Sequence, residues 1–157
     1  MPKIFEKMLQ GLKYVTFIPV DDDPDDREFF QEVVGELPYE IEQTVYKNGQ
    51  EFLNGMVARR DSLPDLVFLN LNMPVKNGKD ALRELRTMEE FKNIPANAIC
   101  STSTSEAVQS ETLLSGADAF ISKATDYGHL KKLISKIFEI DWKNRNVDQK
   151  NFIITTL

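Results

Sequence analysis

Hydrophobic and polar residues follow two alternating spacings along the chain, one typical of strands and one typical of helices. Short apolar or alternating runs, which predict strands, occupy residues 14–20, 41–46, 65–70, 98–100 and 118–122. Between these runs apolar residues recur every three or four positions, as at Phe30, Val33 and Leu37, which predicts helices. The order of strand and helix repeats five times. Such alternation predicts an α/β fold in which a parallel sheet carries helices on both faces.

The expected helices begin at recognisable capping residues. Asp23 followed by Pro24 favours a helix start, because an aspartate side chain accepts from free backbone N–H groups and proline is tolerated in the first turn. Asn48, a serine within 103–105 and Asp126 are candidate caps of later helices. The helix after 103–105 is expected to carry its apolar residues at three positions, Val108, Leu113 and Leu114.

Two segments lie outside the five strand–helix units. Residues 1–13 place five apolar side chains on one helical face, those of Ile4, Phe5, Met8, Leu9 and Leu12. Residues 141–157 are polar and then end in a β-prone stretch. We therefore expect a helical N-terminal extension at 1–13, a main domain at 14–140 and a C-terminal tail at 141–157. The two ends fit either a docked helix and a frayed terminus, or a dimer contact or swapped strand.

Composition narrows the class of protein. The chain has 157 residues, enough for one domain with its own core, and a net charge of -6, which argues against a nucleic-acid or anionic-membrane partner. No apolar run approaches the ~20 residues that cross a bilayer, and the N-terminus lacks the features of a signal peptide. The single cysteine, Cys100, cannot form an internal disulfide. A cytoplasmic protein is the default expectation.

Polar residues follow four of the five predicted strands. The run DDDPDD (21–26) follows the first strand, Asn70 the third, Ser101 and Thr102 the fourth, and Lys123 the fifth. Each alone is a weak signal, because such residues also cap helices or lie on the surface. The carboxyl ends of parallel strands meet at one edge, where ligands bind, so these residues are expected to converge. Carboxylates favour Mg²⁺, and a lysine and a hydroxyl suit a phosphoryl group.

Four motifs in order resemble those of response-regulator receiver domains of two-component signalling: VDDDPDD, DLVFLNLNMPVKNG, CSTS and DAFISK. The resemblance covers residues 14–139, and it is greatest to stand-alone, chemotaxis-regulator-like receivers that partner bacterial phytochromes and hybrid kinases. It implies a flavodoxin-like, doubly wound sheet of five parallel strands in the order 2-1-3-4-5. It also implies a signalling role rather than an enzyme, with a sensor histidine kinase or phosphotransfer protein as the partner. A homodimer is a further possible partner, suggested by the two terminal segments.

The resemblance also implies a role for each residue at the strand ends. Asp21 and Asp22 would form an acidic pocket for Mg²⁺, with Asp22 ranked first as the direct ligand. Asn72 would supply its backbone carbonyl to the metal. The remaining roles are the switch hydroxyl, the phosphate-pairing lysine and the aromatic residue that changes rotamer on activation, at Ser101, Lys123 and Phe120.

The chain departs from the family pattern in four places. Asn70 stands at the phosphoacceptor aspartate, Ala124 stands where a proline usually follows the lysine, and Pro19 lies inside the first strand, where it removes a ladder hydrogen bond. The segment PANAIC exceeds the family pattern by one residue and carries a polar Asn97. The last two departures leave the geometry of the first and fourth strands open, and with it the choice of switch residue among Cys100, Ser101 and Thr102.

The amide at Asn70 predicts that this form is not phosphorylated, because a neutral amide is a far poorer nucleophile than a carboxylate. Its oxygen can still ligate a metal, but the site loses one negative charge, so Mg²⁺ should bind more weakly. The chain would then act by protein–protein binding. Asn70 fits either a natural pseudo-receiver or an ordinary receiver with an introduced substitution.

Two rival functions use the same acidic run. Four residues match positions 1, 3, 5 and 12 of a calcium-binding EF-hand loop, namely Asp21, Asp23, Asp25 and Glu32, although Asp26 stands where that loop needs glycine. The spacing of Asp21 and Asp23 also suits an aspartyl-phosphate hydrolase on a similar α/β sheet, but Pro24 stands where that motif has threonine or valine.

Overall fold

Parallel strands form a single sheet at the centre of the computed structural model, which describes residues 13–100, 105–122, 126–142 and 152–154. The order across the sheet is β2-β1-β3-β4-β5-β6, and every neighbouring pair is parallel. The first five strands therefore have the order that the sequence predicted. The strands are β1 (Tyr14–Val20), β2 (Glu40–Gln43), β3 (Leu66–Asn70), β4 (Ala96–Cys100), β5 (Ala119–Ser122) and β6 (Ile153–Ile154).

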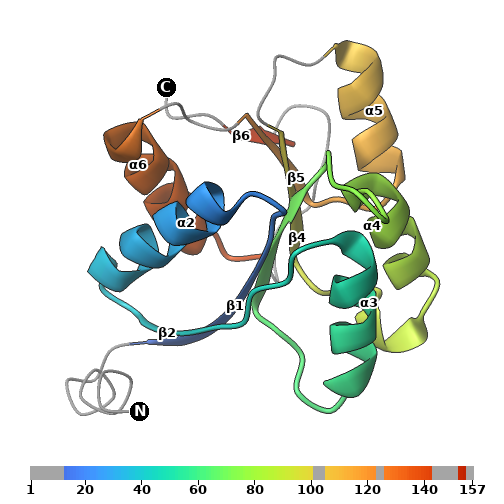
Figure 1. Ribbon diagram of the computed structural model, residues 1–157, viewed down its shortest axis with the longest axis horizontal. Coiled ribbons are helices and arrows are strands. Elements are labelled where there is room, and N and C mark those ends of the chain that lie inside the picture. Colours follow the sequence, from blue (N-terminus) through green and yellow to red (C-terminus); the bar gives the residue numbers. More distant parts are fainter. Residues whose placement is uncertain (1–12, 101–104, 123–125, 143–151, 155–157) are drawn as a thin grey trace.

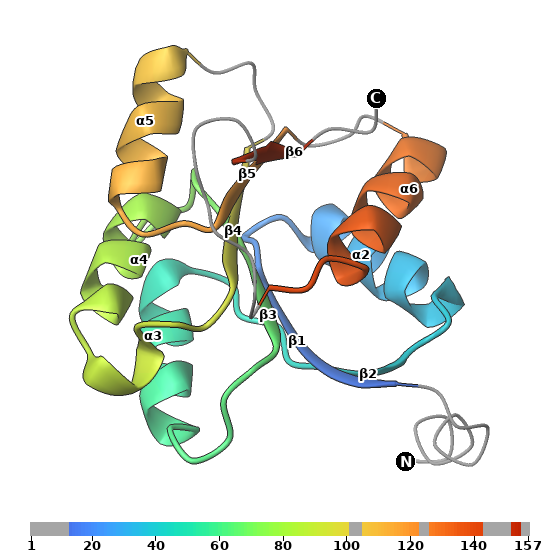
Figure 2. The ribbon, with the colours of Figure 1, turned by 180° about the vertical axis from the view of Figure 1, so that it is seen from behind.

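Helices cover both faces of the sheet, as the alternating pattern predicted (Figures 1 and 2). One face carries α2 (Pro24–Glu36) and α6 (Tyr127–Phe138). The other carries α3 (Gly49–Ala58), α4 (Gly78–Arg86) and α5 (Glu106–Leu114), and a short 3-10 turn, η1 (Glu89–Phe91), follows α4. Each face has its own hydrophobic core, because the side chains of a buried strand alternate between the two faces.

The predicted helix starts are confirmed by their capping bonds. Asp23 accepts from the N–H of Asp25 and Asn48 from that of Glu51. Ser105 and Asp126 accept from the N–H groups three residues ahead in α5 and α6. The bond from His129 N–H also holds the pKa of the Asp126 carboxyl below its ordinary value. The cap of α4, Asn77, was not predicted. Helix caps can be predicted from sequence because the capping side chain and the backbone N–H that it accepts from lie within one turn.

A sixth strand extends the predicted sheet of five. The backbone of the C-terminal tail pairs in parallel with β5, and Phe120 N–H donates to the Phe152 carbonyl at 2.8 Å. Phe152 and Ile154 are buried, in the cores on opposite faces of the sheet, whereas Ile153 between them is exposed. The β-prone end of the tail is therefore a strand paired with its own chain. It covers an edge that would otherwise leave the N–H groups of β5 open.

The second and fourth strands differ in length from the sequence prediction. The second, expected at 41–46, ends at Gln43, and pairing resumes only at an isolated bridge between Val20 and Tyr46. Pro19 explains the gap, because it has no N–H to donate to β2 at this level, although its carbonyl accepts from Tyr46 N–H at 3.2 Å. The fourth begins at Ala96 rather than at 98, and it includes Asn97.

The apolar residues of α5 do not all face the core. Val108 is 38% exposed and Leu114 is 86% exposed, whereas Thr112 is the residue of this helix that is buried. The Thr112 hydroxyl donates to the Val108 carbonyl at 2.7 Å, so the buried side chain has a partner within its own helix. The helix carries the three predicted apolar residues, but of these only Leu113 packs against the core.

Candidate functional site

The carboxyl ends of β1 and β3 bring two aspartates and Asn70 together. The two strands are neighbours, with Val20 in register with Leu69, so the residues that follow stand side by side. Nδ2 of Asn70 lies 3.2 Å from Oδ1 of Asp21 and 3.3 Å from Oδ1 of Asp22. The sequence predicted this convergence from the position of each residue after its strand, and the structure brings the three side chains into direct contact.

The Asn70 amide uses both of its ends. Its NH₂ group donates to the two carboxylates, and its oxygen accepts from the backbone N–H of Asn72 at 3.2 Å. Turning the amide over would set its oxygen against two carboxylate oxygens and its NH₂ against an N–H donor. These partners therefore define the orientation, in which the amide presents hydrogen-bond donors to the acidic pair.

Asp21 and Asp22 have different environments although they are adjacent in sequence. Asp21 is 1% exposed, and its carboxylate also accepts from the N–H of Asp23 at 3.0 Å. Its backbone carbonyl accepts from the Arg27 guanidinium at 2.9 Å, a contact that the sequence did not suggest. A buried carboxylate needs such donors to offset its lost hydration. Asp22, by contrast, is an exposed residue.

The loop after β3 approaches Asn70 closely and depends on a glycine. A Cβ atom at Gly78 would lie 2.2 Å from the Asn70 backbone oxygen and 2.9 Å from its carbonyl carbon. Gly78 N–H donates to the Leu71 carbonyl at 3.1 Å, which closes the loop onto the strand end. Val75, at the exposed tip, has a φ of 68°, an unusual conformation for a β-branched residue. Only glycine at 78 allows this approach.

Of the other predicted site residues, the structure describes Phe120 but not Ser101 or Lys123. Ser101 and Lys123, with Thr102 and Ala124, lie outside the described residues. The strands that precede them end at the same edge, because β4 and β5 pair in register as far as Cys100 and Ser122. Phe120 lies within β5 and is fully buried, with its ring centroid 6.3 Å from that of Phe152. The contact with Phe152 was not predicted, since it depends on the sixth strand.

Comparison with known proteins identifies the family. The model of the response regulator receiver domain matches residues 17–135, which is most of the chain. This chain belongs to the response regulator receiver domain family. Receiver domains are signalling domains rather than enzymes, as the sequence predicted.

Individual relatives agree with this receiver assignment. Chemotaxis protein CheY-3 of Vibrio cholerae is 32% identical over 101 residues, which cover 60% of this chain and 74% of the relative. The phosphorylated cyanobacterial phytochrome response regulator RcpA has a similar fold, with a TM-score of 0.75, 22% identity, and coverage of 87% of this chain and 99% of that one. The Mn²⁺-bound form of response regulator Rcp1 gives a TM-score of 0.71, 21% identity, and coverage of 85% and 99%.

The receiver fold excludes the calcium-loop interpretation. That loop would extend from Asp21 to Glu32, but the structure forms α2 from Pro24 onward, directly after a strand. The EF-hand loop curves around the ion so that its ligands point inward, whereas residues 24–32 form a regular helix and cannot follow that path. The hydrolase interpretation is replaced by the family assignment.

The donor atoms at the strand ends are hard oxygens, but few of them are anionic. Within the described ranges, no group of three or more His, Cys, Asp or Glu side chains is placed to hold a metal ion. Asp21 and Asp22 are two such side chains, and Asn70 is neutral where a third charge would complete the group. Mg²⁺ needs only one or two carboxylates from the protein and keeps several waters. These oxygen donors therefore suit Mg²⁺, although they carry less negative charge than three carboxylates would. Among the helices of the described segments, none is both long and apolar enough to cross a membrane.

Proposed function

We propose that this receiver domain acts in a two-component phosphorelay by binding partner proteins, and that it is not phosphorylated at residue 70. The observation that carries the proposal is the orientation of the Asn70 amide, whose NH₂ group faces the two carboxylates. In a receiver the nucleophile at this position would be a carboxylate oxygen. Here the corresponding oxygen belongs to a neutral amide, and it already accepts from Asn72 N–H.

The metal site of this proposal is a weakened one. Asp22, Asp21, the Asn70 side-chain oxygen and the Asn72 carbonyl would hold Mg²⁺, which when bound would neutralise phosphoryl oxygens. To present its oxygen to the ion, the Asn70 amide must turn and give up its bonds to both carboxylates. The ion also meets one negative charge fewer than an aspartate at this position would supply. Both effects lower Mg²⁺ affinity.

The remaining site roles are also proposals. Ser101 would be the switch hydroxyl and Lys123 the phosphate-pairing lysine; both follow strands that end at the same edge as Asp21 and Asn70. Phe120 would be the aromatic switch residue. Phe120 is fully buried and its ring centroid lies 6.3 Å from that of Phe152, so we expect the C-terminal strand to oppose an outward rotation.

The proposed partner is a sensor histidine kinase or a phosphotransfer protein, and the proposed docking face consists of α5, β5 and α6 together with the added β6. Three exposed apolar side chains support this face, those of Val108, Leu114 and Ile153. A second copy of the chain could use the same face, and the homodimer stays a prediction. A cytoplasmic location, where such partners present their signalling domains, likewise stays a prediction.

The experiment that tests this function measures intact mass after incubation with Mg²⁺ and a small acyl-phosphate donor. The unaltered chain is compared with Asn70→Asp, and Asn72→Asp is the matched control because it adds the same charge two residues away. We expect only Asn70→Asp to gain one phosphoryl group, in a form that is labile at alkaline pH as an acyl phosphate should be.

Two outcomes would contradict the proposal. A phosphoryl group on the unaltered chain would show that another residue serves as the acceptor. If Asn70→Asp stays unmodified as well, the pocket has lost more than its nucleophile, and the proposal that one residue alone blocks phosphorylation is wrong.

A further inference from the structure

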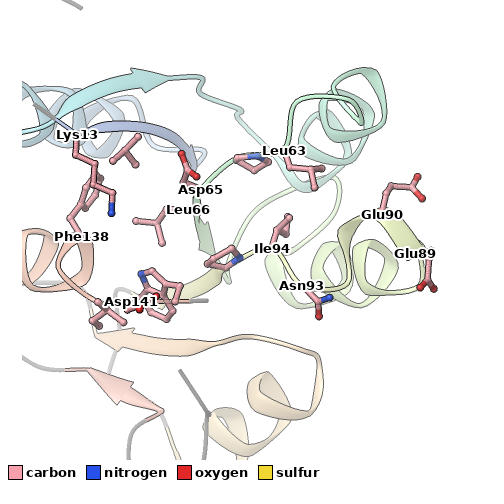
Figure 3. Close-up of a pocket in the computed structure, with 15 residues that line it drawn as sticks. Lys13, Leu63, Asp65, Leu66, Glu89, Glu90, Asn93, Ile94, Phe138 and Asp141 are labelled. Atoms are coloured by element: carbon pink, nitrogen blue, oxygen red, sulfur yellow. The ribbon is translucent and has the colours of Figure 1, made fainter. Parts of the chain in front are cut away.

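A second concave feature lies at the opposite end of the sheet from Asp21 and Asn70. It is a groove with a volume of about 590 Å³ at the amino-terminal end of the strands, where Lys13 precedes β1 (Figure 3). Its apolar walls come from Leu63, Ile94, Phe138 and Trp142. Leu63 is 44% exposed, so part of this apolar surface faces solvent in the described structure. The groove takes no part in the site already described.

The groove is acidic. Four carboxylates and one ammonium group line it, those of Asp65, Glu89, Glu90, Asp141 and Lys13. Glu89 already pairs with Lys92 at 3.0 Å, and the remaining carboxylates still outnumber Lys13. Figure 3 shows Lys13 at one end and the two glutamates at the other. An occupant with an apolar face and positive charges beside it would therefore match both the walls and the charge.

We propose that residues 1–12 of this chain pack into the groove as an amphipathic helix. These residues lie outside the described structure, but their sequence has the required chemistry. One helical face carries Ile4, Phe5, Met8, Leu9 and Leu12. The segment carries two lysines and a single acidic residue, Glu6; Lys7 borders the apolar face, whereas Lys3 lies on the opposite side of the helix.

The attachment point of the segment supports this occupant over others. Lys13 itself lines the groove, and its backbone carbonyl accepts from Glu40 N–H at 2.8 Å, which anchors the chain at the rim. The preceding residues must therefore begin at the groove. Twelve helical residues extend about 18 Å, enough to cross a pocket of this size. A tethered segment also has an effective concentration on the order of millimolar, which a free partner rarely reaches.

The only tryptophan of the chain reports on the groove. Trp142 lies in the wall, and its indole N–H donates to the Ile137 carbonyl at 3.1 Å, which fixes the ring. Its emission maximum and its quenching by acrylamide should therefore depend on whether the groove is covered. The full chain is used throughout, so no truncated form needs to fold.

The experiment compares Leu9→Asp with Gln10→Asp in the full chain. The two variants add the same charge at adjacent positions, one on the apolar face and one on the opposite face. We expect Leu9→Asp to shift Trp142 emission to longer wavelength and to increase quenching, whereas Gln10→Asp resembles the unaltered chain. Equal behaviour of the two variants would overturn the proposal. Far-UV circular dichroism and a cooperative melt confirm that each variant is folded.

A variant in the groove wall provides an independent test. Leu63→Asp should produce the same emission change. Adding Leu9→Asp to it should produce little further change, because both substitutions disrupt the same contact between the segment and the groove. Fully additive changes would contradict the proposal. Emission of the unaltered chain should not depend on protein concentration. A dependence would place the segment of a second copy in the groove and would overturn the intramolecular form.

Discussion

Two buried asparagines on neighbouring strands have opposite environments. Asn70 ends β3 with both ends of its amide hydrogen-bonded, to Asp21, Asp22 and the backbone of Asn72. Asn97 lies inside β4, in register with Phe68, and is completely buried. Its NH₂ group reaches the Val67 carbonyl only at 3.5 Å, and its oxygen has no hydrogen-bond partner among the described residues.

The difference shows what position does to the same side chain. At a strand end the sheet edge supplies carboxylates and loop N–H groups that satisfy an amide. Within a buried strand the backbone groups are already paired in the ladder, so the amide loses water and gains little. Asn70 is therefore tolerated at its strand end, whereas Asn97 should reduce stability.

Among the variants considered, Gly78→Ala should disturb the environment of Asn70 the most. The new Cβ would meet the Asn70 carbonyl at 2.2 Å, so the loop after β3 must shift. We expect a loss of about 3 kcal/mol in the free energy of unfolding, measured by chemical denaturation. The control is Gly35→Ala in α2, where nothing lies within 4 Å of the added atom. That variant should be neutral or more stable, by up to about 1 kcal/mol, because alanine favours the helix. Equal losses would contradict the steric explanation.

The second prediction introduces a charge at the satisfied amide. In chelator, Asn70→Asp should unfold more easily than the unaltered chain, by about 2 kcal/mol. Like charges about 4 Å apart repel by up to ~4 kcal/mol at an effective dielectric near 20, and relaxation of the exposed Asp22 relieves part of that. Mg²⁺ should reverse the order of stability and bind more tightly to the aspartate form. A chelator melt in which the aspartate form is equally stable would show that the carboxylates do not repel.

The third prediction compares the two asparagines directly by replacing each with leucine, which has the same number of heavy atoms. Asn70→Leu removes donors from a buried carboxylate and should cost about 1.5 kcal/mol. Asn97→Leu removes a buried oxygen that has no partner among the residues the structure describes, and it should increase stability by about 1 kcal/mol. Denaturant midpoints at a constant m-value test both. Two changes of the same sign would mean that position does not decide the effect.

The smallest change in stability is expected for Asp22→Asn. Asp22 is exposed and contacts the Asn70 amide at 3.3 Å, so its charge should contribute less than about 0.5 kcal/mol to folding. In an Asn70→Asp background the same substitution should strongly weaken Mg²⁺ binding, measured by titration calorimetry. Unchanged affinity would remove Asp22 from the proposed ligands.

The sequence predicted the parts of the site that depend on position along the chain. Asp21, Asp22 and Asn70 each follow a run of strand residues, and parallel strands bring such residues to one edge. The direction of the Asn70 amide could not be predicted, because it depends on which groups of Asn72 and the aspartates face it. The Arg27 contact with the Asp21 carbonyl has no sequence signal either, since the spacing of six residues matches no capping rule.

What the sequence by itself determined is local or periodic: the alternation of strands and helices, the order of motifs, and the caps at Asp23, Asn48 and Asp126, whose partners lie within three residues. Only the tertiary structure decided that the C-terminal tail adds a sixth strand beside β5, that Leu114 faces solvent, and that Asn97 is buried with no partner for its oxygen in the described part of the chain. The physical reason is range. A cap is complete within one helical turn, whereas strand pairing and burial depend on residues distant in sequence, and apolar spacing alone does not say which of several surfaces will cover a side chain.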